Sequence, residues 1–448
     1  MAQLPVLHLK TLRNSTHPWI FGKMVGRIDR RVGPGALVEV RDRDGGFVGR
    51  GIYNPAKTIA LRLLTEFPAE QIDDDFFRRK LIAAKSLRED VLRLGETGDS
   101  YRLVHSESDG LSGLIVDKFA DVIVIEPFSA GYVALAPRLI RVLQELYPGA
   151  WVCFRPDPRT EEIEGVSFAA LAKQYPAPDG VEIRENQLRM WVDFKSGHKT
   201  GFFLDQRENR ARTASMARGR EVLDLCCYTG GFTISALLGG AARATGVDLD
   251  EKALETAAKN AERNSVKAEW VHANAFDYLR RMQAEGRKAD LVIADPSKLA
   301  GVRAEISRGM RTYGDLNKLA VEAVRPGGIL VTCSCSGLIS PDAFMSIVRN
   351  SAQEAGAILK VLALNGASPD HPVASNFPEG RYLKVIFAQV LPGRKIPRRA
   401  PGEDEAGPGE PDAEGDGLGR GGRRTPERRG PADGQRGRRP SPDRFKPR

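Results

Sequence analysis

The sequence predicts an α/β protein whose C-terminal part is a doubly wound, Rossmann-like parallel sheet, preceded by a small β-barrel and an α+β middle domain. Two patterns predict this. From about residue 188, short apolar strands alternate with helices, which is typical of open, mostly parallel sheets. Over the first seventy residues, apolar and polar side chains alternate between Gly-, Asn- and Pro-containing breaks, which is typical of short antiparallel strands.

The 448 residues divide by composition into four predicted segments: 1–72, 73–187, 188–393 and 394–448. The last is rich in Pro, Gly, Arg and acidic residues and has few apolar side chains. Such a segment cannot bury enough surface to fold, so we expect a disordered tail.

In the first segment, strands are predicted over 36–41, 46–53 and 58–64. They would carry Arg41, Arg43, Arg50 and Arg62 on the outward faces of the barrel. In the second segment we expect a helix opened by the acidic run 73–75, paired strands within 111–128, a helix over 132–147 and a strand over 151–157.

The third segment carries the repeated strand–helix pattern. Strands are predicted over 221–227, 244–250, 289–296 and 327–336, and helices over 251–264 and near 312–325. Ligands of such sheets bind beyond the carboxyl ends of the strands. The residues expected to converge on one cleft are therefore Tyr228, Gly230, Asp248, Asn274, Asp295 and Cys335.

The net charge of +9 is concentrated at the two ends of the chain. Residues 1–72 hold 11 Lys and Arg against 6 Asp and Glu, and residues 394–448 hold 15 against 10. Basic ends around a near-neutral body favour a polyanionic partner, although charge that serves only solubility would look the same.

Five cysteines in a long chain indicate reduced thiols, which favours a cytoplasmic protein over one with a disulfide framework. No apolar run approaches the roughly 18 residues of a membrane span, so no membrane partner is expected.

The loop CYTGGF (227–232) is not the dinucleotide pattern G-x-G-x-x-G. Asp248 ends the second strand of this part, in the place where an acid suits the two hydroxyls of a ribose. Asp248 capping the next helix is the alternative, but the adjacent Asp250 can do that. A nucleotide site without a phosphate-binding glycine set favours S-adenosylmethionine, and Asp295-Pro296 stands where a methyl acceptor would be oriented.

Several motifs follow one another as in the RlmI-type bacterial 23S ribosomal RNA (cytosine-5) methyltransferases. They are KTGFFLDQRENR (199–210), VLDLCCYTGGF (222–232), VDLDEKAL (247–254), RGMRTYGDLNKLA (308–320), GGILVTCSCSGLIS (327–340) and DHPVASNFPEGRYLK (370–384). The resemblance covers roughly residues 5–390. It implies a PUA-type RNA-binding barrel at 1–72, S-adenosylmethionine as co-substrate without a metal, and ribosomal RNA or the large-subunit precursor as partner. The resemblance is also compatible with a homodimer.

The resemblance also carries over Asp205 and Gln206 as cofactor-side contacts, beside Asp224, Tyr228, Gly230, Asp248 and Asn274. Asn274 stands where the family has an acid for the adenine amino group, and its side-chain carbonyl can still accept that hydrogen bond. Ser297 replaces the second proline of the usual Asp-Pro-Pro motif.

Cytosine carbon-5 is too weak a nucleophile to take a methyl group unaided, so such enzymes first add a thiolate to carbon-6. Cys333 and Cys335 lie in phase on one predicted strand, and both point to the same face. Cys335 is nearer the carboxyl end, so we predict it as the nucleophile, with Cys333 as the alternative. Asp295 is expected to orient the base. Cys226 and Cys227 are expected to fill the core.

Two other functions stay open at this point. The same scaffold can methylate another base, such as guanine nitrogen-7, which needs no thiolate. A non-catalytic RNA-binding assembly factor is the other, and Ser297 and Asn274 are the features that permit it. Basic residues near Asp295, namely Lys298, Arg303, Arg308 and Arg311, are candidates for holding the RNA backbone.

Overall fold

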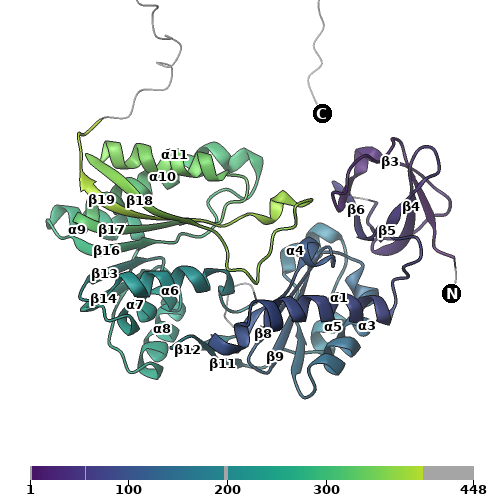
Figure 1. Ribbon diagram of the computed structural model, residues 1–448, viewed down its shortest axis with the longest axis horizontal. Helices are drawn as coiled ribbons and strands as arrows, with labels where there is room; N and C mark the ends of the chain where they lie inside the picture. Colours follow the sequence, from purple (N-terminus) through teal and green to yellow (C-terminus); the bar gives the residue numbers. More distant parts are fainter. Residues whose placement is uncertain (1–2, 56, 196–199, 397–448) are drawn as a thin grey trace, which may run out of the picture. The chain divides into compact units, whose positions relative to one another are not determined.

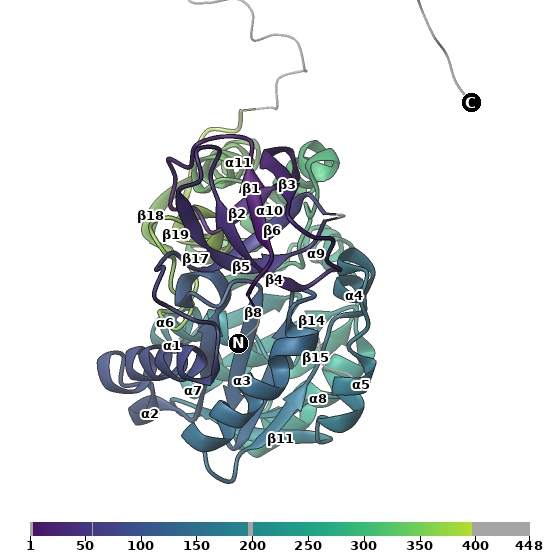
Figure 2. The same cartoon turned by 90° about the vertical axis from the view of Figure 1, so that its right-hand side faces the viewer.

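The computed structural model describes residues 3–55, 57–195 and 200–396 (Figures 1 and 2). Apart from its first three residues, the segment predicted as a tail lies outside the described residues.

The N-terminal segment forms a six-stranded sheet in the order β2-β6-β5-β4-β1-β3. Its strands are β1 (Val6–Leu9), β2 (Trp19–Phe21), β3 (Val25–Ile28), β4 (Ala36–Arg41), β5 (Phe47–Tyr53) and β6 (Ile59–Thr65). The three predicted strands are confirmed as β4, β5 and β6. Leu7, Ile20, Val38 and Leu61 are completely buried between them, because apolar side chains occupy alternate positions.

The expectation that four arginines of this sheet point outward is wrong for two of them. Arg50 is buried. It donates to the backbone carbonyls of Pro68 and Glu70, which follow β6, and it pairs with Glu39 at 3.1 Å. Arg62 pairs at 3.1 Å with Glu107, a residue of the middle segment. Period-two alternation identifies a face of a strand, but not which other segment of the chain covers that face.

The middle segment is built on a four-stranded sheet in the order β10-β9-β8-β7. Its elements are α1 (Asp74–Ser86), η2 (Leu87–Val91), α2 (Leu94–Thr97), β7 (Ser100–His105), η3 (Ser106–Asp109), β8 (Leu114–Phe119), β9 (Val122–Pro127), α3 (Tyr132–Leu146), β10 (Trp151–Phe154), α4 (Pro158–Glu164) and α5 (Ala169–Gln174). The expected pair of strands is the antiparallel pair β8–β9, and the expected helix is α3. Asp73 caps α1 by accepting from the Phe76 amide, and α1 and α3 pack into the same apolar core (Figure 2).

A two-stranded hairpin follows, formed by β11 (Gly180–Glu185) and β12 (Leu188–Asp193). The boundary predicted between residues 187 and 188 lies in its turn. Ile183 and Met190 of the hairpin are buried in one cluster with Ile234 and Ala261 of the C-terminal segment, so apolar packing continues across this boundary.

The C-terminal segment is a seven-stranded sheet in the order β15-β14-β13-β16-β17-β19-β18, and this confirms the doubly wound prediction. Its strands are β13 (Glu221–Leu225), β14 (Arg243–Asp248), β15 (Glu269–His272), β16 (Ala289–Ala294), β17 (Val324–Ser334), β18 (Ala357–Asn365) and β19 (Lys384–Pro392). All neighbouring pairs are parallel except those made by β19, which runs antiparallel to β17 and β18.

Helices cover both faces of this sheet, with α10 and α11 on one face and α6, α7 and α8 on the other (Figure 1). The helices are α6 (Arg207–Met216), α7 (Gly231–Leu238), α8 (Glu251–Arg263), α9 (Ala275–Ala284), α10 (Ile306–Ala323) and α11 (Pro341–Glu354). The helix expected near 312–325 is α10, which begins at Ile306. Among the described residues, no helix is both long enough and apolar enough to cross a membrane.

Candidate functional site

The predicted site residues meet at the carboxyl ends of the central strands. Tyr228, after β13, donates its amide to Asp248 Oδ2 at the end of β14, at 2.8 Å. The Asp295 amide, after β16, donates to the carbonyl of Leu225 at the end of β13, at 3.3 Å. Cys335 Sγ, after β17, lies 4.0 Å from the carbonyl oxygen of Pro296. These contacts join four strand ends into one edge of the sheet, at the point where the strand order reverses.

The loop after β13 turns sharply. Cys226 and Tyr228 have φ values of 61° and 49°, and Gly230 has 84°, all in the left-handed region. A Cβ atom on Gly230 would lie 2.6 Å from the Trp270 ring, so only glycine fits there. Non-glycine residues held in this region are concentrated at binding and catalytic sites.

Asp224 has a carboxylate oxygen that no described protein group satisfies. The side chain is completely buried in β13, and its Oδ2 accepts from the Thr233 amide at 3.0 Å and from the Thr233 hydroxyl at 2.7 Å. Oδ1 is buried without a hydrogen-bond partner among the described residues. Burial raises the pKa of Asp224 to about 7, against the Thr233 bonds, and Asp295 and Asp248 add to the rise. The ammonium group of S-adenosylmethionine is a donor that would satisfy this oxygen.

Asp248 is held by the backbone and still has room to accept. Its Oδ2 and Oδ1 accept from the amides of Tyr228 at 2.8 Å and Asp250 at 2.9 Å. The cap of α8 is Asp250, which accepts from the Ala253 amide at 3.1 Å, so the predicted division of roles between the two acids is confirmed for the cap. Each Asp248 oxygen keeps a further lone pair, which suits a ribose hydroxyl. The hydrogen-bond acceptors Asp224 and Asp248 therefore fit the ammonium group and the ribose hydroxyls of the cofactor.

Asn274 is exposed and caps α9, because its Oδ1 accepts from the Phe276 amide at 2.9 Å. The oxygen predicted to recognise an adenine amino group thus has a helix-capping role as well. Its second lone pair leaves the adenine contact a prediction.

Asp205 and Gln206 are buried in η4 (Leu204–Gln206), beside the acid predicted to orient the base. Gln206 Nε2 donates to Asp295 Oδ2 at 2.9 Å, and Asn209 Nδ2 donates to Gln206 Oε1 at 2.7 Å. The Tyr382 hydroxyl donates to Asp205 Oδ2 at 2.6 Å. Gln206 therefore orients Asp295, a role that the resemblance did not indicate.

Asn209 and Tyr382 were missed by sequence reasoning. Both lie in quoted motifs, KTGFFLDQRENR and DHPVASNFPEGRYLK, but their spacing along the chain says nothing of which side chain they meet. The sequence signal that could have indicated these two residues is that both belong to motifs shared with the family.

The strand-end cysteines differ in access. Cys333 is completely buried, and burial, with the nearby Asp295 carboxylate adding to it, raises the pKa of its thiol well above the ordinary value. Cys335 is one residue beyond β17 and half-buried. Cys226 and Cys227 pack at the end of β13, where burial raises the pKa of both thiols, that of Cys226 to about 12. Of the thiols at this edge, Cys335 is therefore the one best placed to meet a substrate.

The segment after Asp295 presents the basic side chains expected to hold RNA. Lys298, Arg303, Arg308 and Arg311 are all exposed. Pro296 is buried and Ser297 is exposed, so the serine that departs from the family motif does not lie in the packed core.

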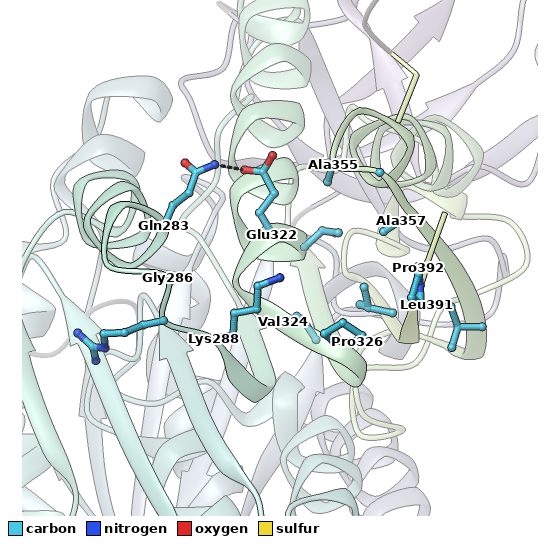
Figure 3. A pocket seen from close by; sticks show the side chains of 14 residues that line it. Gln283, Gly286, Lys288, Glu322, Val324, Pro326, Ala355, Ala357, Leu391 and Pro392 are labelled. Atoms are coloured by element: carbon cyan, nitrogen blue, oxygen red, sulfur yellow. Dashed lines mark hydrogen bonds between the residues drawn. The ribbon is translucent and has the colours of Figure 1, made fainter. Parts of the chain in front are cut away.

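A different hollow, of about 340 Å³, lies at the opposite edge of the sheet (Figure 3). Lys288 and Val324, at the starts of β16 and β17, line it together with Pro392 at the end of the antiparallel β19. None of the predicted site residues lines it. Within the part of the chain that the structure describes, no group of three or more His, Cys, Asp or Glu side chains stands at metal-binding spacing.

Comparison with known proteins accounts for most of the chain. Residues 169–378 match the family model of an S-adenosylmethionine-dependent methyltransferase, and residues 12–66 match that of a PUA-like domain. A putative methyltransferase complexed with SAH superposes with a TM-score of 0.71 at 18% identity, covering 87% of this chain and 100% of the other. A putative methyltransferase from Streptococcus mutans also gives 0.71, at 19% identity, covering 86% and 99%. At these identities the structures show the fold alone.

Curated relatives are closer in sequence. A ribosomal RNA large subunit methyltransferase I from Pseudoalteromonas atlantica is 38% identical over 379 residues, which is 84% of this chain and 95% of the relative. The protein of the same name from Escherichia coli is 37% identical over 380 residues, or 84% and 96%. With both domain models matched in the same order, the chain belongs to the ribosomal RNA large subunit methyltransferase I family of S-adenosylmethionine-dependent methyltransferases.

Proposed function

We propose that the protein transfers a methyl group from S-adenosylmethionine to carbon-5 of a cytosine in large-subunit (23S) ribosomal RNA, through a covalent adduct with Cys335. The names of the relatives support the ribosomal RNA substrate. The observation that carries the chemistry is the half-buried thiol of Cys335, which lies beside the Asp295-Pro296 segment at the edge of the sheet. We expect the protein in the cytoplasm, because the proposed substrate is ribosomal RNA.

The bound cofactor supplies an electrophilic methyl group. The Cys335 thiolate forms a bond to carbon-6 of the cytosine, and the π electrons of the carbon-5–carbon-6 bond move to carbon-5, which becomes nucleophilic enough to take the methyl group. A base then removes the carbon-5 proton, the double bond re-forms and the thiolate leaves. Cys335 thus enters and leaves the cycle as a thiolate.

Asp295 is the acid of the base pocket in this proposal. It stands at the tip of β16, and the Gln206 amide fixes the direction of its carboxylate. Its carboxyl group orients the ring by accepting from the amino group and, when protonated, by donating to nitrogen-3, where negative charge collects during the addition. A target base must leave its stack to reach this edge, and the exposed basic residues after Asp295 are placed to hold the backbone beside it.

The proposed cofactor contacts follow from the hydrogen-bond acceptors at the ends of the strands. Asp224 accepts from the ammonium group, and Asp248 accepts from the ribose hydroxyls. Gly230 lets the loop after β13 come close to the cofactor, and Asn274 accepts from the adenine amino group.

The test is mass spectrometry of ribosomal RNA from a strain that lacks the gene, complemented with wild type, Cys335→Ala or Cys333→Ala. We expect one 5-methylcytosine to be missing in the deletion strain and restored by wild type and Cys333→Ala only. The Cys333→Ala variant is the matched control, because it removes an identical thiol two residues away. A methyl group that Cys335→Ala restores as well as wild type would contradict the covalent mechanism and indicate a ring nitrogen as the acceptor. Binding of the cofactor without any methyl transfer would indicate an assembly factor.

A further inference from the structure

Lys384 is a buried lysine next to the turn that carries Cys335. It is the first residue of β19, it pairs with Ser334 of β17, and it is 5% exposed. Its Nζ donates to the Ser336 carbonyl at 2.6 Å and to the Tyr382 carbonyl at 2.9 Å. Both partners are neutral, so two of the three N–H groups are satisfied without any compensation of the charge.

A buried ammonium is costly unless an anion stands near it. Among the described residues, no carboxylate forms an ion pair with Lys384. Burial lowers the pKa of Lys384 to about 8; Cys335 opposes this decrease, and the charge of Lys298 adds to it. Of these groups, Cys335 is the one whose negative charge favours the ammonium. The interaction is reciprocal, so the ammonium favours the thiolate over the thiol.

Several groups face Cys335 from the elements packed around it. Tyr313 from α10, Cys333 from β17 and Lys384 from β19 interact with it electrostatically. The segment after β16, which carries Asp295 and Lys298, passes it at Pro296. Asp295 opposes a second negative charge. Tyr313 stays neutral, because burial raises the pKa of its hydroxyl, and Cys333 stays a thiol for the same reason. Lys298 is exposed, so water screens its charge. Lys384 is thus the buried cation among these groups.

We propose that Lys384 is the positioning residue of Cys335: its ammonium stabilises the thiolate, and its bond to the Ser336 carbonyl holds the turn that carries the thiol. This rests on the proposed function, in which Cys335 is the nucleophile. The thiol proton leaves to solvent, because a protonated lysine has no lone pair to accept it. The same charge assists the end of the cycle, when the sulfur leaves carbon-6 as a thiolate.

The test measures thiolate formation directly, without methyl transfer. The full-length protein is alkylated with iodoacetamide across a pH series, and modification of the Cys335 peptide is followed by mass spectrometry. In Lys384→Met, we expect the pH midpoint of Cys335 alkylation to rise by about one unit, since a nearby opposite charge shifts such a midpoint by 1–3 units. At neutral pH this is about a tenfold slower reaction. Lys384→Arg keeps the charge and should keep the midpoint near that of wild type.

Lys118→Met is the matched control. Lys118 is half-buried in the middle segment and also donates to two backbone carbonyls, at 2.7 and 3.1 Å. It should leave the midpoint unchanged. If Lys384→Met does not fold, Lys384→Gln keeps a donor for the Ser336 carbonyl and removes the charge, so it gives the same comparison.

An unchanged midpoint in Lys384→Met and Lys384→Gln would overturn the inference, and so would an equal shift in Lys118→Met. Failure of the proposed function looks different: methylation would survive in Cys335→Ala, whatever the alkylation midpoints are.

Discussion

Asp224→Asn should change the pH dependence of folding, because Asp224 is an acid buried with a raised pKa. Its folded pKa is about 7, against 3.8 for the exposed side chain. The folded protein therefore holds this proton more tightly than the unfolded chain does. The contribution of Asp224 to the free energy of unfolding is fully present below about pH 4 and is lost as the pH rises towards 7, where the buried carboxylate must ionise. Asparagine cannot ionise and still accepts from Thr233, so the variant lacks this loss.

The size of the effect follows from the two pKa values. A shift of about three units corresponds to about 4 kcal/mol of free energy of unfolding. Roughly 2.5 kcal/mol of it should develop between pH 5 and pH 8. The amide group of the variant lacks a partner for its N–H groups, which costs about 1–3 kcal/mol, but this cost does not depend on pH.

The assay is urea denaturation of wild type and Asp224→Asn at several pH values between 5 and 8. The difference in free energy of unfolding between the two proteins should move in favour of the variant as the pH rises, while contributions from all other groups cancel. Saturating S-adenosylhomocysteine, which carries the same ammonium group as the cofactor, should stabilise wild type more than the variant. A difference that stays constant across the series would refute the reasoning.

Three further predictions test the other parts of the molecule. Gln206→Met should lower kcat by about 10- to 100-fold, which is the equivalent of losing a charge-assisted hydrogen bond, with little change in the KM for the cofactor. Steady-state kinetics measure both constants. A raised KM for the cofactor with unchanged kcat would instead favour the cofactor contact expected from the sequence. Arg102→Met should destabilise the protein by about 3–5 kcal/mol in urea denaturation, because it leaves Asp117, bound through both oxygens at 2.7 and 2.8 Å, as an unpaired buried charge. The control is the exposed ion pair between Arg189 and Glu182, where Arg189→Met should lower the free energy of unfolding by less than about 1 kcal/mol. Similar losses of stability in both variants would contradict the burial argument. Truncation after residue 393 should weaken RNA binding and reduce its salt dependence, measured by titration at several salt concentrations; an unchanged affinity and slope would show that the tail does not contact RNA.

Much of the fold could be predicted because local patterns determine it. Alternating strands and helices in the third segment predicted an open, mostly parallel sheet, and the structure has such a sheet with helices on both faces and one antiparallel strand, β19. Regular patterns also predicted α3, β8 and β9 near their observed bounds. The hairpin β11–β12 was not foreseen, although buried Ile183, Met190 and Val192 alternate with more exposed neighbours along its two strands. Alternation in strands this short indicates a half-buried strand, but not which strand it pairs with.

The candidate site divides in the same way. Motif positions placed Asp248, Asp295 and Cys335 at strand ends, because a parallel sheet brings all its carboxyl ends to one edge. Motif positions did not tell Gln206 from a cofactor ligand, since its contact with Asp295 joins residues 89 apart in the chain.

The sequence by itself determined which side chains stand at strand ends, which thiols lie in phase along a strand, and which family the motifs resemble. Only the tertiary structure decided access and charge. It buries Cys333 and leaves Cys335 half-buried, although both occupy the same face, and it brings Lys384 from a strand some fifty residues later against the turn that carries Cys335. The physical reason is that periodicity along a strand sets the direction of a side chain, whereas burial and electrostatic environment depend on the elements that pack over it.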